Sequence, residues 1–247
     1  MTSSLAQVSP PLLTGVAIFL TGSAAALVAL HSAMLALAGP RTTLPPRTQV
    51  VLPVMAALLL GGWLGWAVVH THALGLEGPL PGRSSPLAAL PTLAAMLVAI
   101  GVGVSFLSSR TVRTFYAAMP PDWLIRIQVY RTAGASFLWP FMTDGMLPAA
   151  FALPAGIGDA ITGLTAPFVA AAVAQGRPGA HRLAVAWNWF GIIDLIVAPT
   201  AAVLSGTQLA SIHPLGLIPL FLGPPLGILT HIYSLRNLAA NRAASPQ

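Results

Sequence analysis

Long apolar segments, separated by short polar stretches, run through the whole chain of 247 residues. An α-helix needs roughly 20 residues to cross the hydrocarbon core of a bilayer, and each segment reaches that length. The stretches between them are rich in Pro, Gly, Arg and Ser, which is typical of turns. The predicted spans are residues 12–38, 49–72, 87–108, 122–142, 148–174, 181–205 and 215–236.

The composition points to a membrane protein. Hydrophobic residues make up 56% of the chain and charged residues only 6%, and the mean hydropathy is +0.81. Soluble domains carry about 25% charged residues, so this chain cannot cover a surface exposed to water. We therefore expect an all-α, polytopic transmembrane helical bundle of about seven spans, which forms a single domain over residues 1–247.

The basic residues indicate an orientation rather than a surface that binds nucleic acid. The net charge of +6 comes from eleven Arg and five acidic residues, with no Lys. Most Arg residues lie in the connections after the first, third and fifth spans or beyond the seventh, and only Arg83 lies in a connection on the other side. The positive-inside rule then places the N-terminus outside and the C-terminus in the cytoplasm. We expect membrane lipids as partners, and no nucleic acid.

Six polar residues are predicted to lie at membrane depth in the last four spans. Charged groups in hydrocarbon are expensive, so they usually pair inside a bundle and often mark a functional site. Gln128 and Arg131 are three residues apart and share a helix face. Asp159 lies on a stripe of small residues, which predicts close packing against another helix. The candidates for binding or proton relay are Gln128, Arg131, Asp159, Asn188, Asp194 and His231.

The charges of this cluster have to balance. If Arg131 neutralises one carboxylate, the other would be protonated or balanced through His231. One exchangeable proton is what proton coupling or general acid–base chemistry requires. The same polar network could instead serve only to fix the register of the helices.

Three functions fit this pattern. The favoured one is a small-solute transporter, with proton coupling left open, because the cluster lies beside a helix-breaking Pro-Pro pair at 224–225. The second is an intramembrane enzyme acting on a lipid, quinone or isoprenoid, with His231 as proton partner of an aspartate. Its apolar cavity would be lined by Trp187, Trp189 and Phe190. The third is a non-catalytic membrane subunit or sensor.

Sharper catalytic motifs are missing from the sequence. It contains no HExxH zinc motif, no Gly-rich phosphate loop and no GxSxG nucleophile elbow. Without Cys there is no sulfur-ligated metal centre, and without Lys no Schiff base. A metal on His231, Asp159 and Asp194, or a haem between His31 and His231, stays open. We assign no metal site, and we leave the cofactor and the oligomeric state unassigned.

The connection from Arg110 to Asp122 differs from the other connections. It is aromatic and basic, and it is interrupted by two prolines at 120–121. Such a stretch at a cytoplasmic boundary predicts an interfacial segment that lies on the lipid headgroups.

Four stretches of the second half resemble a group of small bacterial multi-pass membrane proteins of uncharacterised function. They are IQVYRTAGASFL (127–138), LPAAFALPAGIGDAITGLTAP (147–167), AWNWFGIIDLIVA (186–198) and LIPLFLGPPLGILTHIYSL (217–235). The resemblance covers roughly residues 122–236 and implies a bacterial cytoplasmic (inner) membrane protein. It implies no activity, cofactor or substrate, so a small-molecule or lipid ligand remains an expectation from the polar cluster alone.

Overall fold

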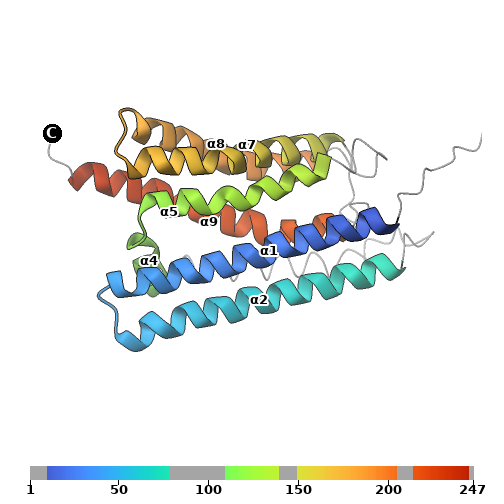
Figure 1. Cartoon of the computed structure of the whole chain (residues 1–247), viewed down its shortest axis with the longest axis horizontal. Coiled ribbons are helices and arrows are strands. Elements are labelled where there is room, and N and C mark those ends of the chain that lie inside the picture. Colours follow the sequence, from blue (N-terminus) through green and yellow to red (C-terminus); the bar gives the residue numbers. More distant parts are fainter. Residues whose placement is uncertain (1–9, 78–108, 139–148, 205–213, 245–247) are drawn as a thin grey trace, which may run out of the picture.

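The computed structural model describes residues 10–77, 109–138, 149–204 and 214–244. These residues form helices joined by short turns, and no strand occurs among them. The long helices run side by side in one bundle (Figure 1). The all-α prediction is therefore confirmed for the described part of the chain.

The long helices coincide with predicted spans. They are α1 (Pro10–Ala38), α2 (Pro46–Glu77), α7 (Ala149–Ala174), α8 (Ala180–Leu204) and α9 (Pro214–Ala244). Helix α9 continues through the prolines at 224–225, so the predicted break does not occur there. The predicted span at 87–108 lies outside the described residues.

Three helices of the described part are long and apolar enough to cross a membrane. They are Ile18–Arg41, Pro46–Trp66 and Ala149–Ala174. A helix with this length and hydropathy buries its apolar surface best in a bilayer. The chain is therefore a membrane-associated helical protein, as its composition predicts.

The turn between α7 and α8 depends on two glycines in left-handed conformations. Gly176 has φ 60° and Gly179 has φ 77°, a region that other residues rarely adopt. The N–H of Gly176 donates to the carbonyl of Val173, and the N–H of Arg177 donates to that of Ala172. This pair of bonds closes α7 as a Schellman motif, so α8 can return alongside α7.

The fourth predicted span begins as the short helix α5 (Pro121–Arg126) and continues as the 3-10 helix η3 (Ile127–Phe137). A 3-10 helix has three residues per turn and rarely runs beyond three or four residues. Its period places every third side chain in one line, and one such line is buried throughout. The residues of this line are Gln128, Arg131, Gly134 and Phe137.

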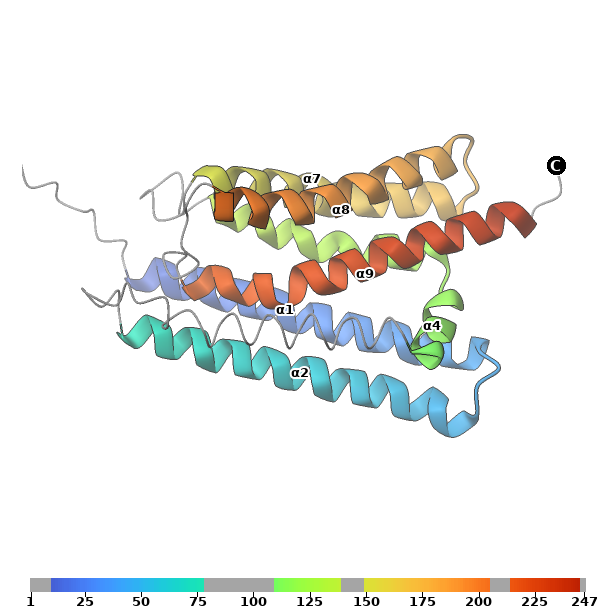
Figure 2. The same cartoon turned by 180° about the vertical axis from the view of Figure 1, so that it is seen from behind.

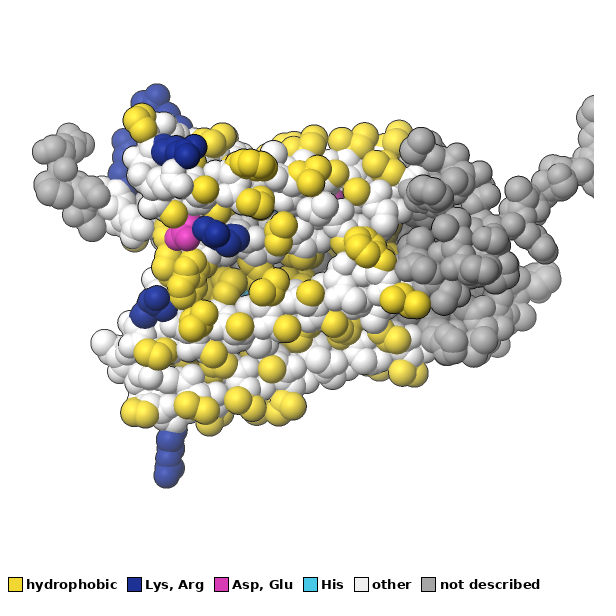
Figure 3. Space-filling model, in the orientation of Figure 1, with side chains coloured by type: hydrophobic (Ala, Val, Ile, Leu, Met, Phe, Trp, Pro, Cys, Tyr) yellow, Lys and Arg dark blue, Asp and Glu magenta, His cyan; other side chains and the backbone are white. Residues whose placement is uncertain are grey.

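The helix α4 (Arg110–Ala117) lies across one end of the bundle (Figure 2). Val112, Phe115 and Tyr116 are buried against α1 and α9, whereas Arg110 and Arg113 are exposed. The prediction that this segment rests on the headgroups is therefore wrong for its apolar face, which contacts protein. Figure 3 shows Arg side chains gathered at this same end.

Asn237 of α9 holds the turn that follows α4. Its Nδ2 donates to the carbonyls of Tyr116 and Met119, at 2.8 Å each. The Tyr116 ring stacks on Tyr233, with centroids 4.5 Å apart. Burial raises the pKa of the Tyr116 phenol, so its hydroxyl stays protonated, and it forms a hydrogen bond with His31 Nε2 at 2.6 Å.

Replacing Asn237 with alanine should lower the free energy of unfolding by about 1–3 kcal/mol, because the carbonyls of Tyr116 and Met119 would lose the amide that donates to both. Equilibrium unfolding in detergent, followed by circular dichroism, measures this loss. Gln175→Ala is the matched control, since Gln175 is exposed and its side-chain oxygen accepts a hydrogen bond from the neighbouring Arg177. Equal stability of the two variants would contradict the assigned role of Asn237.

Candidate functional site

The helices η3 and α7 approach closely because glycines lie where they cross. A Cβ added to Gly134 would overlap the side chain of Asp159, and one added to Gly163 would overlap the backbone of Thr132. The carboxylate of Asp159 therefore lies directly over η3, beside Arg131. The predicted packing of the small-residue stripe around Asp159 against another helix is confirmed.

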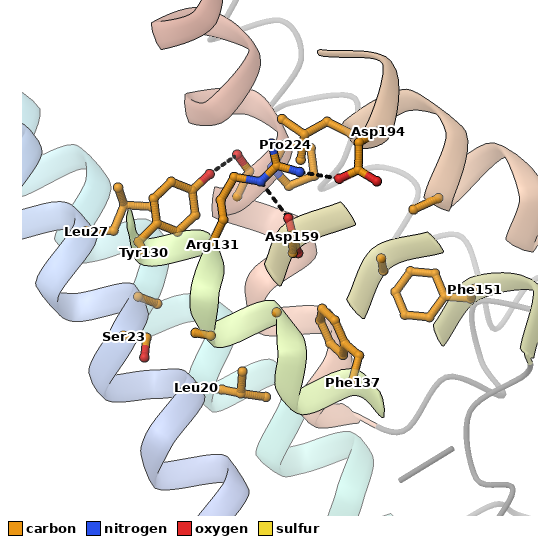
Figure 4. A pocket seen from close by; sticks show the side chains of 17 residues that line it. Leu20, Ser23, Leu27, Tyr130, Arg131, Phe137, Phe151, Asp159, Asp194 and Pro224 are labelled. Atoms are coloured by element: carbon orange, nitrogen blue, oxygen red, sulfur yellow. Dashed lines mark hydrogen bonds and ion pairs between the residues drawn. The ribbon is translucent and has the colours of Figure 1, made fainter. Parts of the chain in front are cut away.

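Arg131 lies at the centre of the polar cluster, and its side chain is only 1% exposed. Its Nε donates to Asp159 Oδ1 at 2.6 Å, and one terminal nitrogen donates to Asp194 Oδ2 (Figure 4). The other terminal nitrogen donates to the carbonyl of Gly191 at 3.2 Å. Arg131 thus joins η3 to both α7 and α8. It shares its single positive charge between two carboxylates, so one negative charge of the pair is left to be balanced.

A glycine also allows α8 to approach α7 closely, as glycines do where η3 crosses α7. A Cβ added to Gly158 would overlap Oδ1 of Asp194, so this carboxylate lies against the backbone of α7. The hydrogen atom at Gly158 leaves room for the carboxyl group to reach Arg131. The position of Asp194 therefore depends on a glycine of the neighbouring helix.

His231 approaches the cluster from α9. Its Nδ1 lies 2.9 Å from Asn188 Oδ1, and its Nε2 lies 3.4 Å from a terminal nitrogen of Arg131. The Nδ2 of Asn188 donates to the carbonyl of Ala184 and to the hydroxyl of Ser234, so its Oδ1 is the acceptor. His231 therefore carries its proton on Nδ1 and turns the lone pair of Nε2 towards Arg131.

This arrangement speaks against one of the two expected ways to balance the charge, the one through His231. Within the described part of the chain, His231 makes no hydrogen bond to Asp159 or Asp194. A neutral imidazole beside Arg131 accepts a hydrogen bond and adds no charge to the cluster. His231 is therefore not the direct proton partner of either aspartate.

Gln128 lies beside the cluster rather than in it. Its Nε2 donates to the hydroxyl of Thr230 at 2.6 Å and to the carbonyl of Gly227 at 3.2 Å. The residue is completely buried. Gln128 thus attaches η3 to α9. The other five candidates form one connected network: Arg131, Asp159, Asn188, Asp194 and His231.

A cavity of about 70 Å³ adjoins the cluster (Figure 4). Its polar wall comes from Tyr130, Arg131, Asp159 and Asp194, and much of the remaining wall is apolar. Most of the wall is apolar, and at its polar side the cavity has room for a few water molecules or a small solute. The aspartates therefore reach space that a ligand can enter.

Two features of this cavity were missed by the sequence reasoning. Leu20, Leu27 and other residues of α1 form one wall, although all the predicted site residues lie in the last four spans. Tyr130 lines the cavity too, and its hydroxyl donates to the carbonyl of Gly223 at 2.9 Å. The only signal for Tyr130 is its place next to Arg131.

The metal alternative does not fit the geometry. Among the described residues, no three of His, Asp and Glu are grouped so that they could hold an ion. The guanidinium of Arg131 contacts Asp159, Asp194 and His231 and keeps them from converging on one point. For the haem alternative, Nε2 of His31 is bonded to Tyr116, away from this cluster.

The aromatic residues of α8 do not form the cavity that an enzyme would need. Trp189 is 54% exposed and Phe190 is 41% exposed, so both face outward from the bundle. Trp187 is buried, and its ring packs beside His231. The predicted apolar cavity lined by these three residues is therefore wrong.

The sequence model of DUF8737, a domain of unknown function, matches residues 87–239. This match covers more than half of the chain and includes η3, α7, α8 and most of α9, which carry the polar cluster. Neither a curated protein nor a solved structure matches the chain.

Proposed function

The chain belongs to the DUF8737 family, and we propose that it transports a small solute across a membrane in exchange with, or together with, a proton. The observation that carries this proposal is an ion cluster in the wall of a cavity inside the bundle. The side chains of Asp159 and Asp194 are 17% and 10% exposed, against 1% for Arg131. The carboxylates, rather than the guanidinium, are therefore accessible from the cavity.

The formal charge of the cluster supports proton coupling. One guanidinium, two carboxylates and a neutral His231 sum to one negative charge. An unbalanced charge at membrane depth is costly. A proton on Asp159 or Asp194 removes it, and exchange of this proton with water in the cavity is the step that coupling requires.

Helix α9 supplies a place where the cavity can open. Pro224 and Pro225 have no backbone N–H, so they cannot donate to the carbonyls four residues before them. Tyr130 donates to the carbonyl of Gly223 at this point and joins η3 to the weakened part of α9. The helix is continuous here but lacks these backbone hydrogen bonds, so it can bend at this point more easily than elsewhere.

We also propose seven spans for the complete chain, including one at 87–108. The Arg side chains at the α4 end of the bundle support a cytoplasmic position for that end (Figure 3). The N-terminus would then lie outside and the C-terminus inside. The proposed location is the bacterial cytoplasmic membrane.

Proteoliposomes that contain a pH-sensitive dye test the proposed function. A panel of small cationic, neutral and anionic solutes is added outside, and the internal pH is followed. Asp159→Asn and Asp194→Asn should each slow solute-driven proton movement by about two orders of magnitude, the scale of losing a proton-transferring group.

Asp122→Asn is the matched control for these variants. Asp122 lies at the start of α5 and pairs with Arg126 at 3.9 Å, away from the cavity. Its replacement should leave the rate unchanged. Wild-type rates in Asp159→Asn and Asp194→Asn would contradict the proposal. A wild-type protein that moves no protons with any solute would favour a non-catalytic subunit.

A further inference from the structure

The wall of the cavity also indicates the chemical class of the solute. Building on the proposed function, we infer that the solute is a small monovalent organic cation of the ammonium type. We further infer that it exchanges with one proton at Asp159 and Asp194. The inference follows from the hydrogen bonds, the shape and the charge of the cavity wall.

The cavity offers free acceptors to a solute. Arg131 uses only Oδ1 of Asp159 and Oδ2 of Asp194. In the described part of the chain, Oδ2 of Asp159 and Oδ1 of Asp194 receive no hydrogen bond. On one side they lie against Gly134 and Gly158, and both side chains are partly exposed where they line the cavity. A cation that carries N–H or polarised C–H groups would find two unused carboxylate oxygens.

The donors in the wall are already engaged. Arg131 is buried and directs its guanidinium to two carboxylates and a carbonyl. The hydroxyl of Tyr130 donates to Gly223, and that of Ser23 donates to the carbonyl of Phe19. When both carboxylates are ionised, an anionic or purely accepting solute would therefore meet them without a free donor, which is unfavourable.

The rest of the wall suits an organic cation better than an inorganic one. Phe137 and Phe151 line the cavity and contact each other edge to face, with centroids 5.4 Å apart. Aromatic faces attract ammonium groups, and quaternary ammonium is the best-known case. Hard metal cations need about six oxygen ligands, whereas this wall presents two free carboxylate oxygens.

The charge of the cluster sets the stoichiometry. With both carboxylates ionised it carries one excess negative charge, which either one proton or one monovalent cation removes. When the cation binds, the carboxylic acid releases its proton to the cavity water, and the cation takes its place as the counter-charge. Each cycle then moves one positive charge in each direction and is electroneutral.

Tetramethylammonium is the probe for this exchange because it cannot carry a proton itself. Wild-type proteoliposomes with internal pH dye receive tetramethylammonium chloride, sodium chloride, a neutral amide or sodium methanesulfonate. Of these four solutes, we expect only tetramethylammonium to make the interior of the vesicles more alkaline. The rate should be the same at membrane potentials clamped with valinomycin and potassium at zero or at strongly negative values.

The outcomes separate this inference from the proposed function. Proton movement driven by the amide, by methanesulfonate or equally by sodium would overturn the cation class but keep proton-linked transport. No proton movement with any solute would overturn both. Alkalinisation that changes with the clamped potential would overturn the one-for-one exchange.

A variant tests the aromatic wall without removing a charge. Phe137→Leu should raise the half-saturating concentration of tetramethylammonium about fivefold, which corresponds to about 1 kcal/mol for a lost cation–π contact. Phe168→Leu, at a position that is 75% exposed on the outer face of α7, should leave it unchanged. Equal values for the two variants would overturn the role of Phe137.

Discussion

Replacing Arg131 with leucine is expected to lower the free energy of unfolding by about 3–5 kcal/mol, the usual cost of breaking a buried ion pair from one side. The reason is that Asp159 and Asp194 would then face each other at membrane depth without the guanidinium that bridges them. Reversible unfolding in mixed detergent, followed by circular dichroism, measures the change. Arg131→Lys should recover little of the lost stability, because a single ammonium cannot bridge both carboxylates with the same planar geometry.

The double variant Arg131→Leu with Asp159→Leu shows whether the stability loss comes from the broken ion pair or only from the changed shape of the side chain. It should be more stable than Arg131→Leu alone, because only one carboxylate is left to be neutralised by a proton. Arg126→Leu is the control, since that side chain is 59% exposed and its pairing with Asp122 is weak. If the two losses of the double variant simply add, Arg131 and Asp159 are not coupled.

Gly158→Ala is expected to cost about 3 kcal/mol, although it adds only one methyl group. The added carbon would overlap the carboxylate of Asp194, which lies against the backbone of α7. Either the helices separate or the carboxylate leaves Arg131, and both responses lose packing or an ionic bond. The same unfolding measurement detects the loss.

Gly22→Ala is the matched control for the added methyl group. It lies in α1, where an added Cβ would meet no described atom. Alanine should therefore be neutral there or stabilise the helix by up to about 1 kcal/mol. If Gly158→Ala were as stable as Gly22→Ala, the close contact between α7 and Asp194 would be refuted.

The helices and the meeting of Arg131, Asp159 and Asp194 could be predicted because hydrocarbon leaves few alternatives. An apolar run of this length has to satisfy its backbone internally, which gives helices with ends close to the polar turns. A charged group at that depth has to find a partner. Both constraints act on the sequence directly, so α7 and α8 end close to their predicted limits.

Which polar side chain bonds to which within the cluster could not be predicted, because the pairing depends on small rotations of the helices. A 3-10 helix and an α-helix differ by one hydrogen-bond register, so they direct their side chains differently. In this structure η3 is a 3-10 helix, and its contact with α7 is close at Gly134 and Gly163. The bridging position of Arg131 and the bond from Asn188 to His231 follow from that packing.

Whether an apolar residue faces lipid or the interior of the bundle could not be predicted, for a different reason. Lipid is as apolar as a protein core, so hydrophobicity does not distinguish outward from inward positions. Trp189 and Phe190 therefore looked as suitable for a cavity wall as Leu20 and Leu27 of α1, which line it. Only the arrangement of the helices separates the two groups.

The bridge from Arg131 to both aspartates is the central claim, and solid-state NMR in lipid bilayers measures it directly. Dipolar couplings between guanidinium ¹⁵N and carboxyl ¹³C report their distances, and Asp159→Asn and Asp194→Asn assign the two signals. The account predicts couplings to both carboxyl carbons at distances below about 4 Å. A coupling to one of them only, or to neither, would contradict it.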